Sequence, residues 1–414
     1  MSDDLSSTMS STVIKNAKVF HRRDILACDV LIERGKIEKI GRVEAAEQEI
    51  DAHGQLLLPG AIDAHVHFRD LGEAYKEDWY SGSCAAAAGG VTTVIDQPNT
   101  RPTTSNVYAY FAKQRAARKS IVDYGINAAI DRPDQLEALW RLGVTAFGEA
   151  FIQQTPRDEL VRALQIIKRL GALLCVHAET NPRQAATEAA GIRTVLDCNQ
   201  TLGAKIHISH LSTAAGLDLV AHATRNVTCE VTPHHLFLSA VDERKLGPFG
   251  MMNPPLRSQF DVRRLWSCLN YVDLIASDHA PHSVADKLMP DPPPGVPGVQ
   301  TLFPLLLSRL DEIGLARLVN LVCAAPAARF NLKSKGVIAE GFDADLVLVD
   351  LEDKRPITPS EMLSKCGWTP FEGCEGIFPS LTMVRGEAVF NEGSIAAKKG
   401  WGNQIYGTGG CGHE

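Results

Sequence analysis

Two histidines and an arginine alternate along one short segment of this 414-residue chain. Residues 59–70 read PGAIDAHVHFRD and follow an apolar stretch at residues 55–58. Alternate side chains of a β-strand share a face, so His65, His67 and Arg69 are expected to point the same way. Two imidazoles can hold one metal ion, and a guanidinium can bind a carboxylate through two parallel hydrogen bonds. The motif alone does not distinguish a metal site from an exposed polar strand, because such short motifs recur by chance.

The overall composition is that of a globular enzyme with one large and one smaller domain. The formal charge of −7 and the lack of Lys or Arg runs argue against a nucleic-acid-binding surface.

No stretch approaches the length of a membrane span, and the acidic, Ser-rich residues 1–11 resemble neither a signal peptide nor an anchor. The ten cysteines form no CxxC pair, and Cys175, Cys229 and Cys323 lie in apolar runs. Reduced thiols and a cytoplasmic location are therefore expected.

Apolar runs of strand length alternate with amphipathic stretches of helix length through the middle of the chain. The eight runs begin at Leu56 and continue at residues 91–96, 124–130, 144–149, 172–177, 205–210, 227–231 and 273–278. Helical candidates between them include residues 134–142, 157–170, 213–223 and 262–269. This alternation predicts an α/β fold, a (β/α)8 TIM-like barrel, whose active site lies at the carboxyl ends of its strands.

Seven of the eight runs end in, or just before, a residue that can bind metal or move protons. These residues are His65 with His67, Asp96, Glu149, His177, His210, Glu230 and Asp278. A single polar residue at a strand end is usually solvated or a cap. The recurrence indicates one shared site, because the ends of barrel strands meet on one face.

Both ends of the chain have β-hairpin character. We expect residues 12–55 and 336–400 to form a small β-sandwich domain around a barrel of residues 56–335. Residues 1–11 are expected to be a disordered tail and residues 401–414 a mobile one. Cys411 and His413 could bind metal, but a loose Gly-rich tail is favoured.

The sequence resembles the dihydroorotases of the amidohydrolase superfamily over nearly its whole length. The matching stretches are PGAIDAHVHFRD, KEDW, AGGVTTVIDQPNTRP, CVHAE, HISHLST, TCEVTPHHLFL, MMNPPLR, ASDHAPH and PPPGVPG. Hydantoinases and allantoinases look similar around HxH but generally lack the arginine and the PNT. The resemblance implies Zn2+, two ions per chain, and the reversible cyclisation of N-carbamoyl-L-aspartate to L-dihydroorotate in pyrimidine (UMP) biosynthesis. It also implies a metal-bound hydroxide as nucleophile, with Asp278 as general acid and base.

The resemblance also implies a set of metal ligands. His65, His67 and Asp278 match the ligands of the more buried zinc, and His177 and His210 match those of the second. Glu230 resembles a residue that joins the cluster in some members and lies behind it in others, and His207 is expected to pack.

Many relatives bridge the metals with a carboxylated lysine, but here that stretch reads GVTAFGEAF and Thr145 stands at the lysine position. Glu149 is expected to bridge instead. The alternative is a surface Glu149 and a single metal.

Substrate contacts follow from the same resemblance. Arg69 is expected to bind the substrate carboxylate with Asn99 and His282. Arg257 is also expected to face the substrate, and main-chain groups near Pro297 and Gly298 are expected to contact the ring. Asp63 and Asp96 are expected to orient the metal histidines, and His234 and His235 to do likewise or to pack.

Two rival functions stay open. One is a dihydropyrimidinase or allantoinase; the other is a non-catalytic partner of aspartate transcarbamoylase. The sequence also allows a homo-oligomer.

Overall fold

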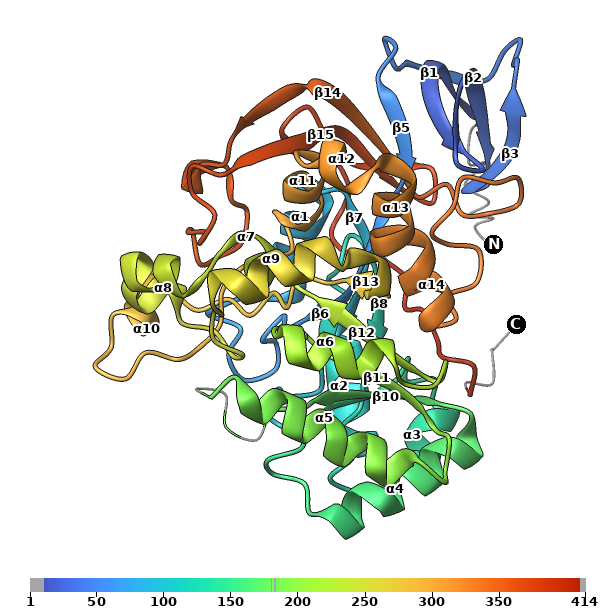
Figure 1. Ribbon diagram of the computed structural model, residues 1–414. Coiled ribbons are helices and arrows are strands. Elements are labelled where there is room, and N and C mark those ends of the chain that lie inside the picture. Colours follow the sequence, from blue (N-terminus) through green and yellow to red (C-terminus); the bar gives the residue numbers. More distant parts are fainter. Residues whose placement is uncertain (1–10, 180, 182–183, 410–414) are drawn as a thin grey trace.

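The computed structural model describes residues 11–179, 181 and 184–409 of the chain (Figure 1). Its centre is a parallel barrel of eight strands. These are β6 (Ala61–Val66), β7 (Val91–Asp96), β8 (Asp123–Ile126), β9 (Phe147–Phe151), β10 (Leu173–His177), β11 (Lys205–Ile208), β12 (Val227–Val231) and β13 (Leu274–Ile275). Strands β6 to β8 and β9 to β13 form two sheets. Parallel bridges from Ala128 to Phe147 and from Val66 to His279 close the ring. The predicted α/β barrel is confirmed, and each expected run supplies one strand.

Helices surround the barrel. They are α1 (Trp79–Ala88), α2 (Val107–Ala117), α3 (Leu136–Arg141), α4 (Arg157–Leu170), α5 (Ala186–Asn199), α6 (Ala214–Ala221), α7 (Pro233–Phe237), α8 (Ala240–Leu246), α9 (Gln259–Ser267), α10 (Val284–Lys287), α11 (Leu302–Leu307), α12 (Leu310–Ile313), α13 (Leu315–Val319) and α14 (Ala325–Arg329). Helix α4 illustrates how the sequence determines which face of a helix is buried and where the helix ends. It buries Leu160, Ala163, Leu164 and Ile167, one stripe of a 3.6-residue repeat. It ends at Gly171, whose φ of 68° is left-handed.

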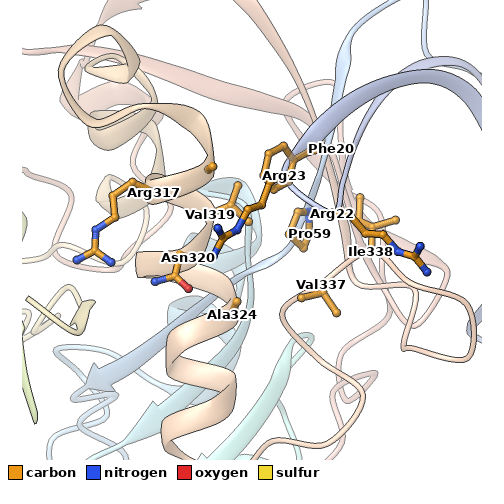
Figure 2. Close-up of a pocket in the computed structure, with 11 residues that line it drawn as sticks. Phe20, Arg22, Arg23, Pro59, Arg317, Val319, Asn320, Ala324, Val337 and Ile338 are labelled. Atoms are coloured by element: carbon orange, nitrogen blue, oxygen red, sulfur yellow. The ribbon is translucent and has the colours of Figure 1, made fainter. Parts of the chain in front are cut away.

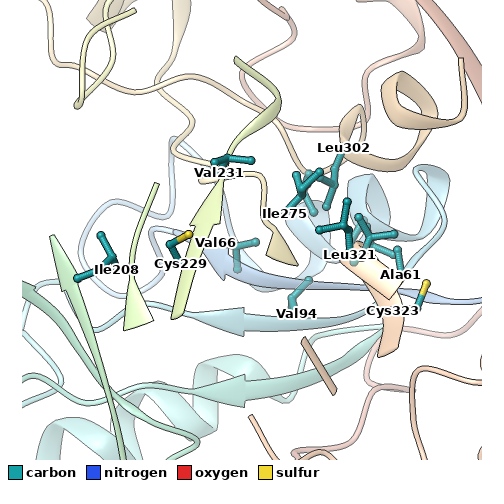
Figure 3. Packing of buried hydrophobic residues seen from close by; sticks show 14 of the residues in the cluster. Ala61, Val66, Val94, Ile208, Cys229, Val231, Ile275, Leu302, Leu321 and Cys323 are labelled. Carbon is teal, nitrogen blue, oxygen red and sulfur yellow. The ribbon is translucent and has the colours of Figure 1, made fainter. Parts of the chain in front are cut away.

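Apolar side chains from the strands and the surrounding helices form one large buried cluster. Figure 3 shows part of it, where Val66 and Val94 of adjacent strands lie near Ile275, and Leu302 and Leu321 pack from the helical side. The described cysteines are all free thiols, and most are buried as small apolar groups. This packed interior holds the strand ends in fixed positions.

The second domain joins both ends of the chain. Strands β1 (Thr12–His21), β2 (Asp24–Glu33), β3 (Lys36–Gly41), β4 (Gln48–Asp51) and β5 (Leu56–Pro59) share one nine-stranded sheet with β14 (Leu346–Pro356), β15 (Glu375–Val384), β16 (Glu387–Asn391) and β17 (Ser394–Ile395). The expected small β domain built from both chain ends is therefore present.

One boundary differs from the expectation. Strand β5 was expected to open the barrel, but it pairs with β1 in parallel and with β14 antiparallel. Its four residues are all buried, and both of its edges are paired with other strands of the β domain. We therefore propose Gly60, between β5 and β6, as the domain boundary.

The C-terminal segment also differs. Residues 401–409 were expected to be mobile, but they pack along β8: Tyr124 N–H donates to Asn403 O at 3.0 Å, and Ile405 N–H donates to Tyr124 O at 2.7 Å. Cys411, His413 and residues 1–10 of the expected N-terminal tail (residues 1–11) lie outside the described residues. Among the described helices, none combines the length and hydropathy needed to cross a membrane.

Candidate active site

The carboxyl ends of the barrel strands bring together four histidines and two carboxylates. His65 lies on β6 and His67 directly follows it; Glu149 and His177 lie on β9 and β10. His210 and Asp278 follow β11 and β13, and both take left-handed backbone conformations, with φ of 34° and 48°. All six side chains are buried.

One group of metal donors consists of His65, His67 and Asp278. Asp278 Oδ1 lies 3.6 Å from His65 Nε2 and 3.1 Å from His67 Nε2. These three atoms are close enough to one another to bind a single ion. They are the three residues that the sequence assigned to the more buried metal.

Glu149 lies between this group and the other two histidines. Its Oε1 is 2.9 Å from His177 Nδ1 and 3.0 Å from His210 Nε2. The same oxygen lies 3.8 Å from His65 Nε2, and Oε2 lies 3.9 Å from His67 Nε2. A carboxylate in this position can offer one oxygen to each of two ions. Glu149 is buried, which excludes the alternative of a surface residue.

The donor atoms suit a cation. His65 Nε2 is buried without a hydrogen-bond partner and faces the carboxylates of Glu149 and Asp278. Burial by itself lowers the pKa of His65, but Glu230, Asp278 and Glu149 outweigh it and raise the pKa to about 10. The same balance raises the pKa of His177 to about 10, mainly through Glu179 and Glu149. The carboxylates thus favour positive charge at this place, and a metal ion can supply it.

Glu230 lies on the far side of His65 from these donors. Its Oε1 is 2.5 Å from His65 Nδ1 and accepts the N–H of His210 at 3.2 Å, while Oε2 is 3.1 Å from His207 Nε2. Glu230 belongs to none of the ligand groups among the described residues. Of the two roles expected for it, this geometry favours orienting His65 over binding metal.

The two expected orienting aspartates have different partners. Asp63 Oδ1 accepts the N–H groups of Ser277 at 2.9 Å and His65 at 3.3 Å, and so connects β6 to the segment that carries Asp278. Asp96 forms a buried ion pair with Lys113 at 2.5 Å and accepts the N–H of Phe68 at 2.7 Å. Asp96 therefore holds the backbone next to His67 and does not contact the ring of a metal histidine.

A cavity of about 120 Å3 opens over the donors. Its lining combines His67, Glu149, His177 and Asp278 with Arg69, Asn99, Phe151, Asn253, Ala280, Pro294 and Gly295. Asn99 Oδ1 lies 2.7 Å from His67 Nδ1, so this amide also orients a metal histidine. The predicted carboxylate-binding pair, Arg69 and Asn99, lies beside the predicted metal ligands.

Three predicted substrate contacts lie elsewhere. The cavity wall is formed by Pro294 and Gly295, whereas Pro297 and Gly298 line a different, small cavity and the Gly298 N–H donates to His279 Nδ1 at 3.1 Å. Arg257 is absent from the lining of the described cavity; its Nε donates to Ser212 at 2.9 Å, and its Nη2 lies 4.0 Å from Glu188 Oε2.

His282 lies behind Arg69. Its Nε2 is 3.2 Å from an Arg69 nitrogen and 3.1 Å from Pro294 O. The histidine is absent from the lining of the described cavity. Through these two contacts it can position Arg69 and Pro294.

His234 and His235 are both buried. His235 Nδ1 is 2.8 Å from the Thr232 hydroxyl, and burial lowers the pKa of His234 to about 4. Both are neutral packed histidines beside the site.

Two site residues were not predicted. Glu179 Oε2 lies 2.8 Å from His177 Nε2, and Asn253 lines the cavity. Both lie in motifs that match the family, CVHAE and MMNPPLR. A polar side chain inside such a motif is the sequence feature that could have identified each of them.

The largest cavity described, about 510 Å3, lies away from the metal donors, between the β domain and helix α13 (Figure 2). Arg317 points out of it in Figure 2 and donates to the carbonyls of Leu269 and Val272, the latter at 2.5 Å. Its lining holds no carboxylate, cysteine or histidine. The cavity lacks the groups that hydrolysis needs.

Comparison with known proteins identifies the family of this chain. The Amidohydrolase family model matches residues 56–389. The dihydroorotase of Methanosarcina mazei is 43% identical over 96% of this chain and 98% of its own, and that of Halobacterium salinarum is 41% identical over 90% and 95%. The L-hydantoinase (dihydropyrimidinase) of Arthrobacter aurescens has a similar fold, with a TM-score of 0.91 and 27% identity over 96% of this chain and 100% of that one. The chain belongs to the amidohydrolase family, and its sequence places it with the dihydroorotases.

Proposed function

We propose that this protein is a zinc-dependent dihydroorotase that interconverts N-carbamoyl-L-aspartate and L-dihydroorotate in pyrimidine biosynthesis. The observation that carries the proposal is Arg69, whose guanidinium lines the same cavity as the metal donors. A cyclic amide with a ring carboxylate matches that pairing, because the arginine can bind the carboxylate while the metal site meets the amide.

Two metal ions are part of the proposal. His65, His67 and Asp278 would hold one ion, His177 and His210 the other, and Glu149 would lie between them. Bound zinc would lower the pKa of a coordinated water and polarise the amide carbonyl.

Asp278 is the proposed proton carrier. Its carboxylate reaches the cavity and also lies 3.1 Å from His67 Nε2. In ring opening it would first accept a proton from the attacking water and then deliver it to the leaving ring nitrogen; in ring closure it would accept the proton of the ureido nitrogen and return it to the hydroxide that departs as water. Asp278 therefore needs to be ionised, and its pKa is lowered to about 2: burial raises it, but His67 and His65 outweigh burial.

Arg69 and Asn99 are the proposed carboxylate binders. Arg69 is held from behind, since its Nε donates to Pro281 O at 3.3 Å and a terminal nitrogen lies 3.2 Å from His282 Nε2. Asn99 is held by His67 through its oxygen, so its amide N–H groups can donate to a substrate carboxylate. Both groups are thus oriented before substrate binds.

The rival activity is that of a dihydropyrimidinase, because the hydantoinases share the fold. Their ring substrates lack the carboxylate, so the half-buried Arg69 would gain no anionic partner from them, and such rings would bind poorly. Purified protein should be assayed with L-dihydroorotate, dihydrouracil and hydantoin, with metal content measured on the same sample. Faster turnover of either uncharged ring would overturn the proposal.

A non-catalytic subunit is disfavoured by the complete donor set. We also propose that the protein associates with aspartate transcarbamoylase or with a second copy of itself, and that it is cytoplasmic. Size-exclusion chromatography with light scattering, run with and without aspartate transcarbamoylase, tests the association. Cell fractionation tests the location.

A further inference from the structure

Lys287, the last residue of α10, is a fully buried lysine without an acidic partner in the described part of the chain. Its Nζ donates to the main-chain oxygens of Met251 at 3.1 Å, Pro293 at 3.0 Å and Gly295 at 3.1 Å. An ammonium group has three N–H donors, so these carbonyls use all of them.

The three carbonyls belong to two segments that form one wall of the cavity. Asn253 lines the cavity two residues after Met251, and Pro294 and Gly295 line it from the other segment. The Gly295 N–H also donates to Met251 O at 2.9 Å. Lys287 and this hydrogen bond together tie the two segments to each other.

A second set of contacts connects this wall, through Trp368 and His282, to Arg69. Trp368 lies 5.7 Å from Lys287 Nζ, measured to its ring centre, and its Nε1 donates to His282 O at 2.8 Å. His282 in turn lies between Pro294 O and Arg69. Movement of the wall would therefore also move the group proposed to bind the substrate carboxylate.

Space filling alone does not account for a charged residue here. Burying an ammonium without a counter-ion costs free energy, and this cost lowers the pKa of Lys287 to about 8. An apolar chain of similar length would fill the same volume without that cost. Three carbonyl oxygens that converge on one point repel one another, and only a cation or several donors can hold them there.

We propose that Lys287 is a positioning residue for the substrate: it fixes the wall of Asn253, Pro294 and Gly295 and so determines how tightly the ring is held. This rests on the proposed function, since that ring is the molecule the wall would contact. Lys287 touches neither the metal donors nor Asp278. Its loss should therefore weaken substrate binding more than it slows the chemical step.

The test compares metal-loaded, full-length native protein with Lys287→Met. We expect KM for L-dihydroorotate to rise about tenfold, kcat to stay within about twofold, and zinc content to be unchanged. Lys287→Gln keeps two donors and should give an intermediate KM; it carries the test if Lys287→Met does not fold. Lys245→Met, at a lysine whose side chain is 72% exposed, is the matched control and should behave as native.

Hydrogen exchange tests, without substrate, whether Lys287 holds the two wall segments together. The Gly295 amide should exchange at least about tenfold faster in the Lys287 variants than in native protein, because the segment it holds opens more often. An unchanged KM in a folded variant, or unchanged exchange at Gly295, would overturn the proposal. Failure of native protein to turn over L-dihydroorotate contradicts the proposed function instead, and the exchange result still decides whether Lys287 holds the wall.

Discussion

Glu149 Oε1 lies 2.9 Å from His177 Nδ1 in the buried group of metal donors. The same oxygen lies 3.0 Å from His210 Nε2 and 3.8 Å from His65 Nε2, so three imidazoles surround it. Burial raises the pKa of Glu149, but His177 and His210 outweigh it and hold the pKa well below its ordinary value. The carboxylate is therefore ionised and in position to bind cations.

Glu149→Gln should weaken the second metal, held by His177 and His210, more than the first. The amide keeps the shape but removes the charge that two neighbouring cations need. We expect native protein to hold two zinc ions and the variant about one. Metal analysis of the dialysed proteins measures this, with Glu387→Gln on the exposed start of β16 as control.

Assembly of the site should also be independent of bicarbonate, because no lysine carbamate has to form. Reconstitution of metal-free protein with and without bicarbonate tests this. A native stoichiometry of one, unchanged in Glu149→Gln, would show that Glu149 does not bridge.

Replacing His65 and His67 together by Ala should remove the more buried metal and abolish turnover. The two residues supply two of the three donors in that group. Zinc content and activity with L-dihydroorotate are the measurements. His53→Ala, at an exposed histidine, should leave both unchanged; retained zinc and activity in the double variant would refute the assignment.

Arg69→Lys should leave metal content normal and lower kcat/KM for L-dihydroorotate. Lysine keeps the charge but cannot form two parallel hydrogen bonds with a carboxylate. The loss should correspond to roughly 2–5 kcal/mol, the range for breaking a buried charged contact. Arg34→Lys, on an exposed turn, is the control, and an unchanged kcat/KM in Arg69→Lys would exclude a bidentate role.

Asp78→Ala should destabilise the protein by about 1 kcal/mol, because Asp78 caps α1 by accepting the N–H groups of Tyr80 and Ser81. Asp78 also pairs with Lys365 at 2.7 Å. Burial raises its pKa, but Lys365 and the capped N–H groups outweigh burial and lower the pKa from 3.8 to about 2. Denaturant unfolding measures the difference.

The sign of the pH effect follows from that lowered pKa. The stabilisation is complete above the unfolded-state pKa of 3.8 and is lost as the pH falls towards 2. Asp78→Asn keeps the cap but loses the ion pair, so its stability should depend less steeply on pH in this window. Identical slopes for native protein and Asp78→Asn would contradict the assignment.

The sequence by itself determined the barrel and the positions of the metal donors. The period and length of hydrophobic runs are local properties of the sequence. In a barrel, residues at the carboxyl ends of the strands all lie on the same face. His65, His177 and Asp278 could therefore be assigned to one site before any contact was known. The departure at Glu149 was also visible, because a lysine was missing from one strand.

Only the tertiary structure decided which loop residues line the cavity beside the metal donors. Pro294 and Gly295, not Pro297 and Gly298, form the wall, because Lys287 reaches across the loop to hold them. Arg257 Nε donates to the hydroxyl of Ser212, a residue 45 positions away in the sequence, and Arg257 is absent from the lining of the described cavity. Loop direction and the pairing of β5 with β14 depend on partners far away in the chain, and local sequence patterns carry no information about them.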